Sequence, residues 1–245
     1  MTIPYSLVCA IYPLRCRLCG TPLHHTQFTR LQICTSCFKK IVKERIKGPR
    51  CSTCGVPLIS EEGNCLQCRR REQKNEQSRE YYFDSHYSIF MYQDTTQLLI
   101  KAYKFDPLPA PAYLWAHFIV KELPSRYSKS PLIVPVPARK SSIRSRGWDQ
   151  MELIRRILSR KYRLPTAVLL KRRGSASQKQ LNYVQRMENL TGHIKYRPTN
   201  RTTPKEVLLI DDVYTTGATL DECARVLKLH GVSKVSALTI AMAPY

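Results

Sequence analysis

Two adjacent carboxylates near the C-terminal end lie between an apolar run and a Thr/Gly loop. They are Asp211 and Asp212, in the segment VLLIDDVYTTGATL that spans residues 207–220. The apolar run predicts a buried strand, and the residues after the loop have the spacing of a helix. In an open parallel sheet, ligands bind beyond the C-terminal ends of the strands, and both acids would lie at such an end.

The loop after the acids has the composition of a phosphate site. Free amide groups at the start of a helix, together with the helix dipole, favour an anion. Glycine lets the backbone approach a ligand closely, and threonine hydroxyls donate hydrogen bonds. Because two carboxylates can accept hydrogen bonds from a vicinal diol, acids and loop together predict a ribose 5-phosphate site, although a surface turn with an N-capping threonine is the alternative. The predicted loop residues are Thr215, Thr216, Gly217, Ala218 and Thr219.

Eight of the ten cysteines form four C-x-x-C pairs in the first third of the chain. Two thiolates separated by two residues can bind one metal ion from a tight turn, and a second such turn completes a tetrahedron. The segment CRLCGTPL at residues 16–23 is repeated as CSTCGVPL at residues 51–58. This repeat favours two sequential sites, with interleaved ligation as the open alternative. The predicted ligands are Cys16, Cys19, Cys34 and Cys37 in one site, and Cys51, Cys54, Cys65 and Cys68 in the other.

With four protein ligands, each site would be closed and structural, and zinc is the expected metal. Units of this size have almost no apolar core, so zinc would supply folding free energy on the order of 10 kcal/mol per site. A redox dithiol is the alternative, but four pairs in one chain favour metal. His24 and His25 could substitute as ligands. Cys9 and Cys223 are unpaired, and Cys223 is expected to be a small core residue of a helix.

A polar segment divides the 245 residues, which suffice for one ordinary domain and a small one. Residues 1–72 are predicted to form the zinc-binding domain, residues 73–84 a linker and residues 85–245 the main domain. In the main domain, strand-like and helix-like segments alternate, and the strands are apolar throughout. This pattern predicts an α/β fold with a mostly parallel, doubly wound sheet. The predicted strands are 87–92, 132–136, 167–170, 207–210 and 235–242, and the predicted helices are 96–104, 151–162 and 220–229.

The chain is strongly basic, with 40 basic and 18 acidic residues and a formal net charge of +22. This excess favours a polyanionic partner such as nucleic acid, a phosphorylated ligand or an anionic membrane, and a solvated basic surface is the alternative. Residues 1–14 are apolar but contain two prolines and no positive n-region. They are a poor signal peptide and too short to span a bilayer, so a cytoplasmic protein is expected, with peripheral membrane contact as an option.

The segment IDDVYTTGAT resembles the phosphoribosyl pyrophosphate signature of the type I phosphoribosyltransferases. By that resemblance, Asp211 and Asp212 hold the ribose hydroxyls and the loop from Thr215 to Thr219 holds the 5-phosphate. Mg²⁺ would bridge oxygens of the pyrophosphate and the ribose, with few protein ligands. A turn after residue 137 and a stretch similar to the family's mobile loop would contact the pyrophosphate. Those predicted contacts are Ala138, Arg139, Lys140, Arg172 and Gln178.

The chain as a whole resembles the ComF (ComFC-like) family, in which a zinc ribbon precedes a phosphoribosyltransferase domain. The matching stretches are AYKF at 102–105, VPVP at 134–137, RGWDQ at 146–150, LKRRGSASQ at 170–178 and NYVQR at 182–186. Three departures stand out. KFDPLP replaces a segment that usually has a glycine soon after K-F, and RGWDQ replaces RGFNQ. Thr215 stands where purine-type transferases commonly have an aspartate that handles a base proton.

The ComF resemblance implies a role in DNA uptake for natural transformation, on the cytoplasmic side of the membrane. Its implied partners are single-stranded DNA, a helicase-like ComF protein and other uptake proteins. Two alternatives stay open: an active phosphoribosyltransferase with an unknown acceptor, and a regulator that senses the ribosyl ligand without turnover. Because Thr215 cannot accept a base proton, the residues identify the bound group more clearly than any reaction.

Overall fold

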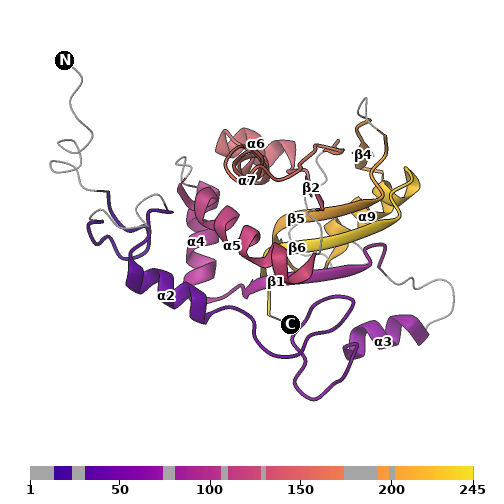
Figure 1. Ribbon diagram of the computed structural model, residues 1–245, viewed down its shortest axis with the longest axis horizontal. Coiled ribbons are helices and arrows are strands. Elements are labelled where there is room, and N and C mark those ends of the chain that lie inside the picture. The colour runs from indigo at the N-terminus through magenta and orange to yellow at the C-terminus, as the bar shows by residue number, and fades with distance from the viewer. Residues whose placement is uncertain are drawn as a thin grey trace.

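A four-stranded parallel sheet forms the centre of the computed structural model, which describes residues 14–23, 31–73, 81–105, 110–127, 131–173, 192–198 and 202–244. The strand order is β1-β6-β5-β2, and every neighbouring pair is parallel. Figure 1 shows these strands beside one another, with helices packed around them. The strands are β1 (Ser85–Met91), β2 (Leu132–Pro135), β5 (Glu206–Tyr214) and β6 (Lys234–Met242).

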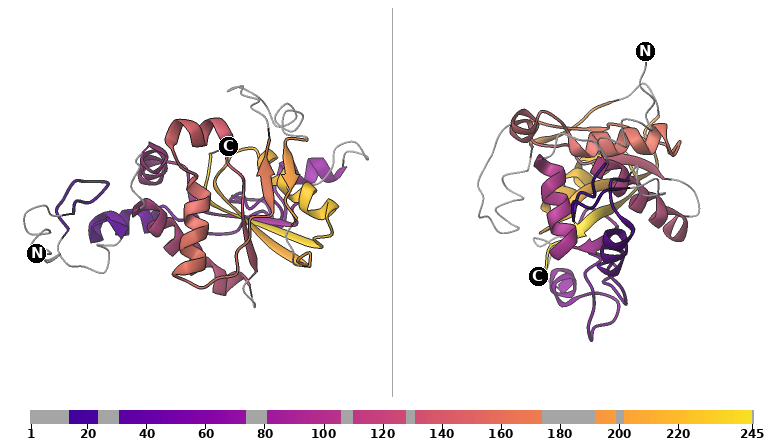
Figure 2. Two further views of the ribbon diagram at one scale, coloured as in Figure 1. Left: turned by 90° about the horizontal axis from the view of Figure 1, so that it is seen from above. Right: turned by 90° about the vertical axis from the view of Figure 1, so that its left-hand side faces the viewer.

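Helices cover both faces of this sheet, and Figure 2 shows them from two further directions. Along β5, Leu208 and Ile210 enter the core formed with α4, α5 and α7, whereas Val207 and Leu209 enter the core formed with α9. A strand that is buried on both faces needs apolar residues at successive positions, which explains the continuous run. The fold class is therefore confirmed as α/β. These helices are α4 (Asp94–Phe105), α5 (Ala110–Arg126), α6 (Lys140–Arg146), α7 (Gln150–Arg160) and α9 (Ala218–Leu229).

One expectation about the main domain was wrong. Residues 167–170 do not form a strand of the central sheet; instead β3 (Leu170–Arg172) pairs antiparallel with β4 (Ile194–Tyr196) in a separate two-stranded sheet. The long helix α5 was also not predicted. It is buried on most sides and has Pro124 inside it, so its sequence has neither a clear apolar stripe nor an unbroken run of helix-forming residues.

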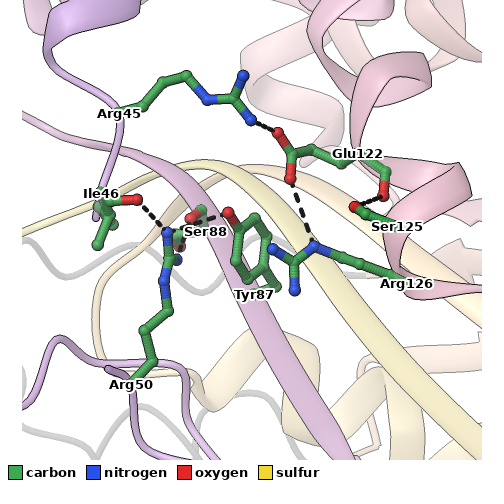
Figure 3. A network of polar contacts seen from close by, with 8 residues as sticks. All are labelled: Arg45, Ile46, Arg50, Tyr87, Ser88, Glu122, Ser125 and Arg126. Atoms are coloured by element: carbon green, nitrogen blue, oxygen red, sulfur yellow. Dashed lines mark hydrogen bonds and ion pairs between the residues drawn. The ribbon is translucent and has the colours of Figure 1, made fainter. Parts of the chain in front are cut away.

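The cysteine-rich segment contributes α2 (Thr35–Lys43) and α3 (Leu66–Gln73) and packs against the main domain. Phe38 of α2 stacks on Phe118 of α5, with ring centroids 5.4 Å apart. In the polar network of Figure 3, Arg45 and Arg126 both pair with the buried carboxylate of Glu122. The predicted domain boundaries stay a prediction.

Tyr87 of β1 lies between two guanidinium groups of this network (Figure 3). Arg50 lies 4.0 Å and Arg126 3.1 Å from the centroid of its ring. Arg50 also donates to the Ser88 carbonyl at 2.6 Å. Burial is the main cause that lowers the pKa of Arg50 to about 10. These contacts fix the cysteine-rich segment to β1 and α5.

Within the described ranges, no helix is both long and apolar enough to traverse a bilayer.

Candidate functional site

The paired acids lie near the C-terminal end of β5, which extends beyond the predicted apolar run as far as Tyr214. The backbone N–H of Asp212 donates to the Asp211 carboxylate at 2.8 Å, and the N–H of Val213 donates to the Asp212 carboxylate at 2.7 Å. Asp211 lies opposite Thr239 in the register with β6. The sheet therefore holds both carboxylates in fixed orientations next to each other.

Lys104, in the last turn of α4, forms an ion pair with Asp212. Its ammonium nitrogen lies 2.7 Å from a carboxylate oxygen of Asp212, and both side chains are mostly buried. The AYKF stretch contains this lysine, but spacing along the chain gave no reason to pair it with an acid more than a hundred residues away. Lys104 therefore places a positive charge beside the paired acids at the cavity wall.

The surroundings of Asp211 raise the pKa of its carboxyl group. Burial, and then the negative charge of Asp212, raise the pKa of its carboxyl to about 8, and Lys104 and Arg172 offset this only in part. Asp211 therefore takes up a proton more readily than an ordinary carboxyl, whereas Asp212 is paired with an ammonium group. A protonated carboxyl donates a hydrogen bond and a carboxylate accepts one, so the pair can do both, which suits a vicinal diol.

Asp211→Asn should stabilise the ligand-free protein at alkaline pH. Because the folded-state pKa of about 8 lies above the ordinary value of 3.8, the wild type loses stability as pH rises towards 8. The slope is at most about 1.4 kcal/mol per pH unit. Thermal unfolding of both proteins should give a difference in melting temperature that grows in favour of the variant from pH 6 to pH 8 and then levels off. A difference that is constant over this range would contradict the raised pKa.

The phosphate loop, residues 215–219, connects β5 to α9. Gly217 is the N-cap of α9 and has φ of 79°, which is the left-handed region. A Cβ atom at Gly217 would lie 2.8 Å from the hydroxyl oxygen of Tyr214, so only glycine fits there without displacement. Because α9 starts at Ala218, its first amides have no acceptors within the helix and are suited to an anion.

A cavity of about 320 Å³ opens at this end of the sheet. Its walls bring together seven of the predicted ligand-binding residues. It is also lined by Lys104, Arg146, Asp149 and Gln150, for which the sequence predicts no role. Lys140, Thr216, Gly217 and Ala218 do not line it. The seven are Ala138, Arg139, Arg172, Asp211, Asp212, Thr215 and Thr219.

Two of the predicted pyrophosphate contacts carry positive charge into this cavity. Burial, followed by the charge of Arg139, lowers the pKa of Arg172, with the Asp211 carboxyl opposing this effect. Arg139 is exposed and Arg172 is partly buried, and an anion bound between the two guanidinium groups would offset their mutual repulsion. Gln178, like Cys9, His24 and His25, lies outside the described residues.

The RGWDQ stretch forms the turn from α6 to α7 and places three side chains, Arg146, Asp149 and Gln150, on the cavity wall. Gly147 ends α6 with φ of 82°, and the Asp149 carboxylate caps α7 by accepting from the N–H of Glu152 at 3.1 Å. Arg146 donates to the side-chain oxygen of Gln150 at 2.7 Å. Within the described part of the chain, the side-chain nitrogen of Gln150 is buried without a hydrogen-bond partner. This amide is available to a ligand.

The eight paired cysteines form two sequential groups, so the interleaved alternative is wrong. In each group, all four sulfur atoms lie within 4.8 Å of one another, as one tetrahedral ion requires. A set of four thiolates with no open position fits a structural zinc ion. Cys223 is fully buried in the core on the α9 side of the sheet, as expected. The first four-cysteine site comprises Cys16, Cys19, Cys34 and Cys37, and the second four-cysteine site comprises Cys51, Cys54, Cys65 and Cys68.

Comparison with known proteins covers both parts of the chain. A family model described as the double zinc ribbon domain matches residues 7–69. Competence protein ComFC of Streptococcus pneumoniae is 28% identical over 237 residues, which are 93% of this chain and 99% of the relative. Competence protein F of Haemophilus influenzae is 25% identical over 240 residues, 95% of this chain and 98% of the relative. A hypoxanthine-guanine phosphoribosyltransferase structure from L. donovani aligns over 59% of this chain and 67% of its own, at 10% identity and a TM-score of 0.30.

Proposed function

Because the chain belongs to the ComF family of competence proteins, we propose that it acts in DNA uptake by binding phosphoribosyl pyrophosphate, with Mg²⁺, and single-stranded DNA. One observation supports binding of phosphoribosyl pyrophosphate: Asp211 and Asp212 share a cavity with the phosphate loop and two arginines. Recognition of a ribosyl phosphate explains why that combination of groups is assembled at the end of β5.

The charges of the cavity favour one orientation of this ligand. The 5-phosphate lies on the phosphate loop, where the first amides of α9 and the threonine hydroxyls donate to it. The ribose diol then meets Asp211 and Asp212, and the pyrophosphate extends towards Arg139 and Arg172. Mg²⁺, held with the ligand oxygens and the Asp212 carboxylate, would neutralise the pyrophosphate and polarise its bond to the ribose.

The side chains of the cavity support binding of phosphoribosyl pyrophosphate better than they support transfer of its phosphoribosyl group to an acceptor. Thr215 is exposed at the loop and cannot serve as an acid or a base at neutral pH. The Asp149 carboxyl lines the cavity, but it caps α7. A phosphoribosyltransferase with an unidentified acceptor is the second candidate, favoured by the open hydrogen-bonding capacity of Gln150 on the cavity wall. A sensor of the ligand without turnover is the third.

Exposed basic side chains on and near α6 and α7 support the proposal of a DNA-binding surface. Arg139, Lys140 and Arg144 lie before and along α6, and Arg156 and Arg160 lie on α7. Such residues neutralise backbone phosphates, which gives affinity that depends on salt and little on sequence. The remaining partners in this proposal are a helicase-like ComF protein and other uptake proteins on the cytoplasmic side of the membrane.

The double variant Asp211→Ala with Asp212→Ala separates these functions. It should lose binding of phosphoribosyl pyrophosphate and any release of pyrophosphate, because the diol contacts and the Mg²⁺ contact are removed together. Its binding of a labelled single strand should stay within about twofold of wild type and weaken with salt, since the basic surface is intact. Fluorescence anisotropy measures binding of the strand, a pyrophosphate assay measures release, and titration calorimetry measures binding of phosphoribosyl pyrophosphate.

Three outcomes distinguish the candidates. Pyrophosphate release by the wild type in the presence of an acceptor would establish transfer. Ligand binding that changes DNA affinity without release would establish a sensor. Loss of DNA binding in the double variant, with the fold retained by circular dichroism, would contradict a separate basic surface and place the strand in the cavity.

A further inference from the structure

We infer that His86 and Tyr214 are positioning residues that join the second four-cysteine site to the phosphate loop, so that metal in that site and order in the loop support each other. The inference rests on the proposed function for its ligand and adds a means of regulating that ligand site. Three successive contacts support the inference, and each contact involves buried groups.

The first contact joins the second four-cysteine site to β1. The backbone N–H of His86 donates to the carbonyl of Thr53 at 2.9 Å, and ring atom Nδ1 of His86 lies 2.7 Å from the carbonyl oxygen of Cys54. Gly55 has φ of +69°, and a Cβ atom there would lie 2.3 Å from the His86 carbonyl oxygen. The turn that holds Cys51 and Cys54 is therefore seated directly on the His86 backbone.

The second contact joins His86 to Tyr214. Their rings are stacked, with centroids 4.1 Å apart and planes inclined by 18°. The other ring nitrogen of His86 lies 2.9 Å from the hydroxyl oxygen of Thr239. Because both nitrogens have partners and the ring is buried, its plane is fixed, and the Tyr214 ring must lie nearly parallel to it.

The third contact joins Tyr214 to the loop. Tyr214 is the last residue of β5 and immediately precedes Thr215. The Tyr214 ring lies against Gly217, where an added Cβ would be 2.9 Å from a ring carbon and 2.8 Å from the hydroxyl. A shift of the Tyr214 ring would therefore move the glycine that starts α9, and with it the amides that face the phosphate.

The first four-cysteine site provides an internal comparison. Its helix α2 contacts α5 through Phe38 and Phe118 instead of approaching the phosphate loop. The two sites have similar turn sequences, CRLCGTPL and CSTCGVPL. Coupling between two sites must act in both directions, so a ligand on the phosphate loop should also affect the second four-cysteine site. If the ligand slows hydrogen exchange in residues 51–58 and leaves residues 16–23 unchanged, the effect can be assigned to the connection through His86.

Hydrogen exchange of the full chain, followed by mass spectrometry, tests the inference in two ways. Without ligand, removal of zinc by a chelator should accelerate exchange in residues 214–220 by about fivefold or more, and leave α7 nearly unchanged. With zinc, phosphoribosyl pyrophosphate and Mg²⁺ should slow exchange in residues 51–58 by a similar factor, and leave residues 16–23 unchanged.

His86→Phe is the informative variant, because it retains a stacking ring but loses the bond to the Cys54 carbonyl. It should abolish both effects. His230→Phe is the matched control, since His230 also stacks on a tyrosine, Tyr196 at 4.4 Å, and also bonds a backbone carbonyl through Nδ1. His230→Phe should retain both effects.

The outcomes separate this inference from the proposed function. If zinc removal leaves residues 214–220 unchanged, or accelerates α7 equally, the inference is wrong whether or not the ligand binds. If zinc removal acts on the loop as expected but phosphoribosyl pyrophosphate protects no segment, the proposed ligand is wrong and the connection stands. If His86→Phe behaves as the wild type, the connection does not pass through His86.

Discussion

Gly217→Ala should weaken binding of phosphoribosyl pyrophosphate by about 10- to 100-fold. The added Cβ would meet the hydroxyl and ring of Tyr214 at 2.8–3.0 Å, and alanine is strained at φ of +79°. Tyr214 cannot move away, because it is buried and stacked on His86. Strain of this kind costs about 1–3 kcal/mol, and the loop can relieve it only by leaving the geometry that binds phosphate.

Gly231→Ala is the control for this prediction. Gly231 follows the other end of α9 and has φ of +90°, but a Cβ there would meet no atom closer than 3.7 Å. The Gly231→Ala variant should show a similar fall in the free energy of unfolding as Gly217→Ala, whereas its ligand affinity should stay at the wild-type value. Titration of both variants, after melting temperatures have confirmed that they fold, makes the comparison. Equal affinities would show that the loop is not formed as a phosphate site.

Cys51→Ser with Cys54→Ser should be the most destabilising of the cysteine changes. All four cysteines of the second four-cysteine site are buried, and this site packs against β1 through His86. Loss of its zinc removes folding free energy on the order of 10 kcal/mol, which at about 2–4 °C per kcal/mol for a chain of this size lowers the melting temperature by roughly 20 °C or more. The protein should then contain a single zinc ion per chain, because only the first four-cysteine site still binds metal.

The equivalent change in the first four-cysteine site, Cys16→Ser with Cys19→Ser, should remove one zinc ion at a smaller cost in stability. Cys19 is exposed, and Cys34 of the same site is only partly buried. Zinc content by elemental analysis and thermal unfolding of the full chain measure both effects. A larger fall for the first site than for the second would contradict the role of the second site as the one joined to the main sheet.

Local sequence was sufficient for the parts of the molecule in which neighbouring residues act together. The run from Val207 to Ile210 predicted a strand buried on both faces, and the acids and the Thr/Gly loop that follow it predicted the position of the cavity. Spacing within each C-x-x-C pair predicted the metal ligands. The repeat of a whole turn favoured the sequential grouping of cysteines that the folded chain has.

The rest of the site depends on contacts between residues that are distant in sequence. Lys104 reaches Asp212 only because the fold brings the last turn of α4 close to the C-terminal end of β5, and no pattern near Lys104 encodes that pairing. Gln150 was noticed as part of a family motif, but its buried amide is recognised only when the cavity is formed. The link from Cys54 through His86 to Tyr214 likewise joins three segments that the strand order brings together.

Titration calorimetry of the wild type with phosphoribosyl pyrophosphate tests the central claim most directly. In the presence of Mg²⁺ near neutral pH, one ligand per chain should bind, and the heat should disappear in the double variant Asp211→Ala with Asp212→Ala. Binding without Mg²⁺ should be weaker, because the charge of the pyrophosphate is then neutralised only by basic side chains of the cavity, such as Arg139 and Arg172. No heat of binding with the wild type, or heat that is unchanged in the double variant, would contradict the assignment of this cavity.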